Sequence, residues 1–254
     1  MAEEEKIREH AKHALQALTD RTKNWKDRIK DFIWEVFIIV VAVNITLWFH
    51  NWSDKRHEQA QVKDFLIDTR ESLVQDTIHI WDYINFMTNH PLAYYDSVLS
   101  QIDRHQIDAQ YIDSLYFQLT NNKGMEINYG IYQSFSSANN LRLIENRKLL
   151  SDIISLYTNY FPTMQLYVKQ LYDRRSDGFY QHIMPKTGWD NSSAKLSTII
   201  YEQEVINVFL LGENFIKEVN GNSEYIINQT SAVISEIDKE LKDRFDYKVK
   251  NPNK

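Results

Sequence analysis

FIWEVFIIVVAVNITLWFHNW, residues 32–52, is the most apolar stretch of the chain. A helix rises about 1.5 Å per residue, so this stretch spans about 31 Å, close to the thickness of the hydrocarbon core of a bilayer. Residues 36–43 are all apolar, whereas a surface helix of a soluble protein would carry a polar stripe. The pattern predicts a transmembrane helix over residues 31–52; the alternative is the buried central helix of a soluble protein.

Three tryptophans lie near the ends of this stretch, Trp34 at one end and Trp48 and Trp52 at the other. Tryptophan is enriched at the headgroup depth of membranes, so these three are predicted to be membrane-interface residues. A cleaved signal peptide fits poorly, because the stretch begins late in the chain and no small-residue cleavage site precedes Asn51. We therefore expect the helix to remain attached as an anchor.

Two polar residues inside the stretch are candidate intramembrane functional residues. Glu35 is the only charged residue there, and a carboxylate within a membrane can serve proton or ion movement. It also lies one turn inside the boundary, near Lys26 and Lys30, and from there its side chain would reach the interface. Asn44 lies nearer the middle, where its amide could bond to a second copy of the helix. Asn44 is therefore compatible with self-association of the helix.

Basic residues flank the stretch unequally. Five Lys or Arg residues occur in residues 21–31 and three in residues 53–63. Basic residues are retained on the cytoplasmic side, so the N-terminus is predicted to be cytoplasmic. The part of the chain after residue 52 would then lie in the periplasm, if the protein belongs to a bacterial inner membrane.

The chain as a whole is predicted to have four parts. They are a cytoplasmic amphipathic arm (residues 1–30), the transmembrane helix (31–52), an extracytoplasmic helical domain (53–248) and a tail (249–254). With only six Gly and four Pro, the chain has few helix breakers, and no strand-like alternation of useful length occurs. The predicted fold class is all-α: an N-terminal amphipathic helix, then one transmembrane helix that continues into an extracytoplasmic helical bundle.

Breakers inside the domain predict where its helices end. Pro91 is expected to end the helix that begins at Ser53, and Pro162 is expected to kink or end a later one. Residues 176–195, which hold glycines, a proline and paired serines, are expected to be the longest irregular stretch. The sequence NGN at residues 220–222 is expected to form a turn between two final helices.

Composition limits the partners of the protein. A net charge of -6 argues against nucleic acid as a partner, because phosphate binding requires a basic surface. The lack of cysteine excludes disulfides, thiolate metal sites and cysteine nucleophiles. The expected partners are the lipid bilayer and either a second copy of the chain or another membrane or periplasmic protein.

Sequence motifs of catalysis do not occur in the chain. It has no phosphate-binding glycine loop, no His-Glu-x-x-His site and no Gly-x-Ser-x-Gly elbow. Asp103, Asp108 and Asp113 are too scattered to define a site. No catalytic, cofactor-binding or metal-ligating residue is predicted, and the protein is not expected to be an enzyme. A buried polar pocket with convergent carboxylates would favour an enzyme, and a solid apolar bundle would not.

Two stretches together resemble a known family. They are EVFIIVVAVNITLWFHNWSDKRHEQAQVKDFLIDTRESLVQD (Glu35–Asp76), an apolar helix that ends in Asn-Trp before a charged helix, and IYQSFSSANNLRLIENRKLLSDIISLYTNY (Ile131–Tyr160). The pattern is similar to that of bacterial, chiefly Bacteroidota, single-pass membrane proteins with a domain of unknown function. The chain departs from that family at Ala138-Asn139-Asn140, where a small residue and glycine are usual. The resemblance implies an inner-membrane anchor and a helical extracytoplasmic domain, and it implies no activity.

The sequence therefore favours a membrane-anchored, non-enzymatic helical protein that acts through protein–protein interaction or sensing in the periplasm. The alternative is a subunit of an ion- or proton-conducting membrane assembly that uses Glu35.

Overall fold

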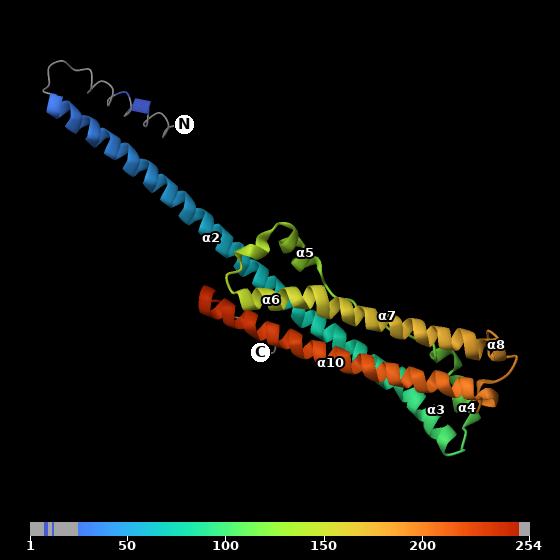
Figure 1. The fold of residues 1–254 in the computed structure, drawn as a ribbon. Coiled ribbons are helices and arrows are strands. Elements are labelled where there is room, and N and C mark those ends of the chain that lie inside the picture. Colours follow the sequence, from blue (N-terminus) through green and yellow to red (C-terminus); the bar gives the residue numbers. More distant parts are fainter. Residues whose placement is uncertain (1–7, 10–11, 13–24, 249–254) are drawn as a thin grey trace. The chain divides into compact units, whose positions relative to one another are not determined.

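The fold is that of a computed structural model that describes residues 8–9, 12 and 25–248. All the secondary-structure elements in these residues are helices, which confirms the all-α prediction (Figure 1). The elements are, in chain order, α2 (Trp25–Met87), the π-helix η1 (Thr88–Leu92), α3 (Ala93–Asp103), α4 (Ala109–Ser114), the 3-10 helix η2 (Tyr116–Gln118), α5 (Gly130–Ser137), the 3-10 helix η3 (Asn140–Leu143), α6 (Arg147–Ser155), the π-helix η4 (Leu156–Tyr160), α7 (Phe161–Gly178), the π-helix η5 (Phe179–Ile183), α8 (Met184–Thr187), α9 (Leu196–Ile199) and α10 (Gln203–Phe245).

The contacts divide the chain into two compact units, Met1–Gln61 and Val62–Lys254. The first buried core residue of the second unit, here called the helical domain, is Val62. Most of the predicted amphipathic arm and the tail lie outside the described residues. Residues 25–30, the end of that arm, are the first turns of α2.

The helix α2 covers the predicted transmembrane stretch and continues without a break into the first helix of the helical domain. No glycine or proline occurs before Pro91 in the described part of the chain, so nothing in the local sequence interrupts the backbone hydrogen bonds. The predicted continuity of the apolar helix with the next helix is confirmed.

The helical domain is built on three long helical segments. They are the C-terminal part of α2 with η1 and α3, the run from α6 to α8, and α10, which contacts both of the others (Figure 1). The core side chains repeat every three or four residues along each segment, so each helix buries one face. Shorter helices between Ala109 and Leu143 cover this bundle.

All three π-helical segments in the described residues adjoin a proline. Pro91 lies inside η1, and Pro162 and Pro185 follow η4 and η5 within two residues. Proline lacks an N–H donor, and its ring crowds the carbonyl one turn back; a wider turn accommodates both effects. The prediction that Pro91 ends its helix is therefore wrong, and residues 176–187 are helical rather than irregular.

The predicted turn at residues 220–222 is also wrong, since α10 is one continuous helix. Asn220 and Ser223 are buried, and Asn220 Nδ2 donates to Thr88 Oγ1 at 3.0 Å. Contacts with η1 hold this segment in the helix, although asparagine and glycine have weak helix propensity. Tertiary packing overrides local preference here.

Arg175 joins three elements in the interior of the helical domain. Its guanidinium donates to Leu119 O at 2.8 Å, to Asn121 O at 3.0 Å and to Tyr95 Oη at 3.2 Å. The residue is buried, yet no carboxylate among the described residues pairs with it. It therefore fixes the segment after η2 against α3 and α7 through hydrogen bonds to neutral acceptors.

Replacing glycine with alanine is expected to have opposite effects on stability at two positions of α10. A Cβ at Gly212 would lie 2.1 Å from Cε2 of the buried Tyr95 ring, whereas a Cβ at Gly221 would meet no atom within 4 Å. Gly212→Ala is expected to lower the free energy of unfolding by about 1–3 kcal/mol through overpacking. Gly221→Ala should raise it by about 0.5–1 kcal/mol through helix propensity. Thermal and denaturant unfolding of the full chain in detergent would measure both; equal effects of the two would contradict the close approach of α10 to α3.

Candidate functional site

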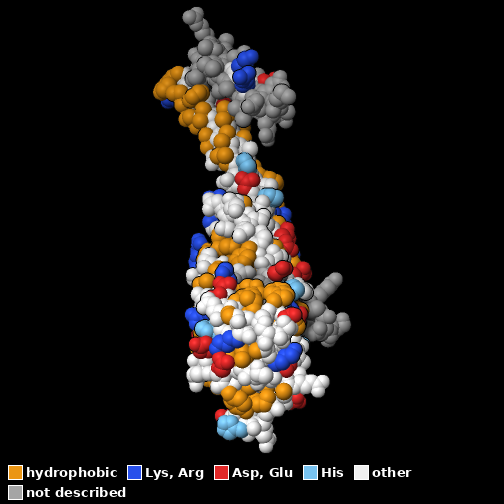
Figure 2. Space-filling view, turned by 90° about the vertical axis from the view of Figure 1, so that its right-hand side faces the viewer, with side chains coloured by type: hydrophobic (Ala, Val, Ile, Leu, Met, Phe, Trp, Pro, Cys, Tyr) orange, Lys and Arg blue, Asp and Glu red, His pale blue; other side chains and the backbone are white. Residues whose placement is uncertain are grey.

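The N-terminal part of α2 is the only helix among the described residues that is long and apolar enough to cross a membrane. Its most apolar 18-residue window has a mean hydropathy of 2.2, and none of that window is buried in the structure. Figure 2 shows hydrophobic side chains crowded along this segment, while charged side chains are mixed over the face of the helical domain. The segment therefore lacks the burial expected of the central helix of a soluble protein.

The three predicted interface tryptophans lie at the ends of this exposed segment. Trp34 and Trp48 are each 63% exposed, and Trp52 is 44% exposed. Along a helix, Trp34 lies about 21 Å from Trp48 and about 27 Å from Trp52. The Arg56 guanidinium stacks over the Trp52 ring at 4.6 Å, so charge begins where the aromatic residues end.

Polar side chains within the apolar segment bond to their own helix. Asn44 Nδ2 donates to Val40 O at 2.7 Å, and Thr46 Oγ1 donates to Ala42 O at 2.9 Å. Such bonds satisfy polar groups where no water is available. Glu35 is half-buried and lies about nine residues, or 13 Å, from Asn44 along the helix. The structure therefore does not bring the two candidate polar residues together.

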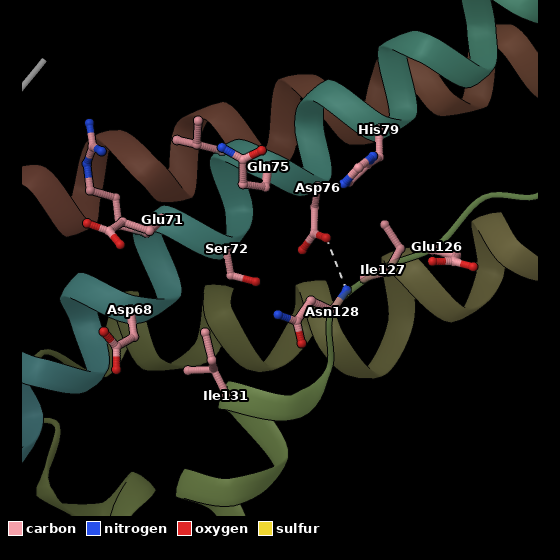
Figure 3. Close-up of a pocket in the computed structure, with 12 residues that line it drawn as sticks. Asp68, Glu71, Ser72, Gln75, Asp76, His79, Glu126, Ile127, Asn128 and Ile131 are labelled. Atoms are coloured by element: carbon pink, nitrogen blue, oxygen red, sulfur yellow. Dashed lines mark hydrogen bonds between the residues drawn. The ribbon is translucent and has the colours of Figure 1, made fainter. Parts of the chain in front are cut away.

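A cavity of about 620 Å³ opens on the helical domain between α2 and the segment that leads into α5. We call it the polar cavity (Figure 3). Asp68, Glu71 and Glu126 are exposed at its rim, while Asp76 and Ser72 are buried in its wall. Positions 68, 72 and 76 share one face of α2, which explains why one helix supplies most of the polar lining.

Asp76 is the most constrained of these residues, being only 2% exposed. Its Oδ1 accepts a hydrogen bond from Asn128 N at 3.0 Å, while its Oδ2 has no partner among the described residues (Figure 3). Burial raises the pKa of this carboxyl above its ordinary value, against the smaller opposite effects of the Asn128 bond and of His79. A charged Asp76 therefore costs stability unless another group compensates it.

Thr69 and Ser72 share the face of α2 that carries Asp76, and the Tyr157 phenol is near enough to be affected by the Asp76 charge. Thr69 Oγ1, Ser72 Oγ and Tyr157 Oη are buried and without a hydrogen-bond partner of good geometry. The Ser72 hydroxyl lies beside Tyr157, and the Tyr157 ring stacks on Tyr132 with centroids 4.7 Å apart. Burial first, and then the Asp76 charge, raise the pKa of the Tyr157 phenol, which therefore stays protonated.

Two of the three aspartates considered in the sequence for a dispersed site, Asp108 and Asp113, have structural contacts. Asp108 accepts from Tyr111 N and caps α4, and Asp113 accepts from the N–H and the hydroxyl of Ser197 at the start of α9. The polar cavity does gather carboxylates, the feature expected of an enzyme. Ser72 Oγ, however, has no hydrogen bond to a base that would activate it as a nucleophile.

Sequence reasoning did not identify Asp76. The signal that could have found it is the position of a charged residue on an apolar stripe, three residues after Leu73 and four before Ile80, both fully buried. Ser72 and Thr69 occupy the same face. Three polar residues on one buried face predict a polar site inside the bundle.

The substitution Asp76→Asn tests the cost of this buried charge. Asparagine keeps an acceptor for Asn128 N–H and removes the charge. Since burial raises the folded-state pKa above the ordinary 3.8, the charged form penalises folding at neutral pH, and the penalty disappears as the pH falls below that ordinary value. The variant is expected to be more stable than the wild type at pH 7 and equal to it in acid. The control is Glu224→Gln, which makes the same charge change on an exposed face of α10. An Asp76→Asn variant that is less stable than the wild type at pH 7 would contradict this account.

Comparison of the chain with models of known protein families, with curated proteins and with solved structures finds no match.

Proposed function

We propose that the protein is a membrane-anchored, non-enzymatic helical protein that acts by binding a protein or sensing a ligand outside the cytoplasm. The observation that carries the proposal is the exposure of the whole apolar window of α2. A surface this apolar and this long is unfavourable in water, at roughly 25 cal/mol per Å² of apolar area. Lipid tails would cover it on all sides, as its lack of a polar stripe requires.

The flanking charge supports the proposed orientation of the protein. The excess of basic residues before the apolar segment supports a cytoplasmic N-terminus and a helical domain on the opposite side. The resemblance of residues 35–76 and 131–160 to Bacteroidota single-pass proteins supports a bacterial inner membrane, with the domain in the periplasm.

The chemistry of the helical domain supports binding rather than catalysis. No group of three or more His, Asp or Glu side chains in the described residues could hold a metal ion. The polar cavity contains acceptors and hydroxyls, but Ser72 has no activating base. Such a lining can hold a ligand through charge and hydrogen bonds.

The alternative, ion or proton conduction through Glu35, would need several copies of the helix to enclose a pathway. Asn44 already donates to its own backbone, so its bond to a second copy would use the remaining donor and acceptor. Glu35→Gln distinguishes the two: abolished ion flux across vesicles containing the protein would favour the conducting assembly. Unchanged flux is the result expected here.

Alkaline extraction of membranes from cells that produce the full chain tests the proposal. The chain should stay in the pellet at high pH and dissolve only with detergent. Crosslinking in intact membranes, before solubilisation, should then give discrete adducts through the helical domain. A chain that is extracted without detergent would remove the anchor, and one recovered only as an isolated monomer under every crosslinking condition would count against an interaction function.

A further inference from the structure

We propose that the polar cavity binds a small organic cation that carries two or more alkylammonium groups. This inference deepens the proposed function, because it names the ligand class that the helical domain would sense. It rests on the charge of the rim, the unpartnered groups of the wall and the spread of the carboxylates.

The rim of the cavity carries negative charge that no cation neutralises. Asp68, Glu71 and Glu126 are exposed there and have no ion-pair partner among the described residues. Burial and the charges of Asp64 and Glu71 raise the pKa of the Asp68 carboxyl, which shows the mutual repulsion of the acids. A bound cation would relieve this repulsion.

The basic residues of the lining leave the acids available. Arg70 is committed to Asp238 on α10, with Nε to Oδ1 at 2.5 Å and a second contact of 3.4 Å. His79 is the only other basic side chain in the lining. Figure 3 shows His79 on α2 beside Asp76, with Glu126 across from it. The carboxylates therefore outnumber the uncommitted cations.

The wall of the cavity offers acceptors to a ligand that donates hydrogen bonds. Asp76 is 2% exposed and Ser72 is 7% exposed, and both residues line the cavity. Each also has a buried side-chain oxygen without a hydrogen-bond partner, Oδ2 in Asp76 and Oγ in Ser72. Figure 3 shows the Asp76 carboxylate pointing from α2 toward Asn128. An ammonium group has three donors and would compensate both the charge and the missing hydrogen bonds.

The geometry favours an organic cation over a metal ion. The acids do not converge closely enough, in the described residues, for three to hold one ion. Val74, Ile127 and Ile131 also line the cavity, so the alkyl chain of a ligand would have apolar surface to contact. The cavity volume of about 620 Å³ is in the range of small-molecule sites.

Calorimetric titration of the full chain in detergent with putrescine and with spermidine tests the proposal. Both amines should bind, and spermidine should bind more tightly. Butanediol, which has a similar carbon chain and no charge, should not bind, and magnesium should not compete. Glu126→Gln and Asp76→Asn are expected to weaken putrescine binding at least tenfold.

Glu224→Gln is the matched control, because it removes one negative charge from an exposed surface away from the cavity. Its affinity for putrescine should equal that of the wild type. The proposal is overturned if neither amine binds, if butanediol binds equally, or if Glu224→Gln weakens binding as much as the cavity variants. Thermal unfolding checks that each variant is folded. If Asp76→Asn does not fold, Glu126→Gln alone tests the proposal, because Glu126 is exposed. Titration in detergent does not depend on membrane topology. A negative titration would therefore overturn the ligand proposal alone, and the membrane anchor would still be tested by alkaline extraction.

Discussion

Replacing Arg175 with methionine is expected to lower the free energy of unfolding of the helical domain by about 2–4 kcal/mol, since buried acceptors would lose their donors. The two most buried acceptors are Leu119 O and Tyr95 Oη. Methionine keeps much of the apolar volume, so the loss reports on hydrogen bonds rather than on a cavity. For a domain of this size the melting temperature should fall by about 4–16 °C.

Arg174 is the matched control for this prediction. It is the residue before Arg175 in α7, it is exposed, and its guanidinium stacks over the Phe215 ring at 4.2 Å. Arg174→Met should cost about 0.5–1 kcal/mol, the typical value of an exposed cation–π contact. Arg175→Lys should behave like Arg175→Met rather than the wild type, because an ammonium group cannot reach all three acceptors in the fork geometry. Equal losses at the two arginines would show that the buried hydrogen bonds do not stabilise the fold.

Two lysines in the middle of the apolar segment should prevent stable membrane insertion. Val40 and Val41 are exposed and lie near the centre of the segment. Each lysine at the centre of a transmembrane helix costs about 2.5–3.5 kcal/mol, so Val40→Lys with Val41→Lys costs about 5–7 kcal/mol. The variant should move from the alkali-resistant to the extractable fraction, whereas Asn51→Lys at the interface should stay in the membrane. Retention of the double variant at the wild-type level would mean that lipid does not surround this part of α2.

The sequence was sufficient to predict the helical class and the continuation of the apolar helix into the next one. The apolar stretch has no polar stripe, and no glycine or proline interrupts the chain before Pro91. These signals are local, so they can be interpreted without knowledge of the tertiary structure. The exposure of Trp34, Trp48 and Trp52 at the two ends also agrees with a helix solvated along its length.

The continuation of helices through prolines and through NGN depends on contacts that are distant in the sequence. Asn220 is held in α10 by Thr88, and π-helical turns accommodate Pro91 and Pro162. Local propensity gives only the intrinsic cost of placing these residues in a helix. It does not include the tertiary packing that offsets this cost. The polar cavity was missed for a related reason. Asp76 is buried by the tertiary packing, and its one hydrogen bond comes from Asn128, in the segment that leads into α5.

Single-cysteine labelling tests the central claim, that lipid surrounds the apolar part of α2, most directly. The chain lacks cysteine, so Val41→Cys, Ser231→Cys and Lys12→Cys each give one reactive site at an exposed position. In intact spheroplasts, a membrane-impermeant maleimide should label position 231 only, and permeabilisation should add position 12. Position 41 should react only after detergent removes the lipid. Labelling of position 41 in undisturbed membranes, at the rate seen for position 231, would contradict the account.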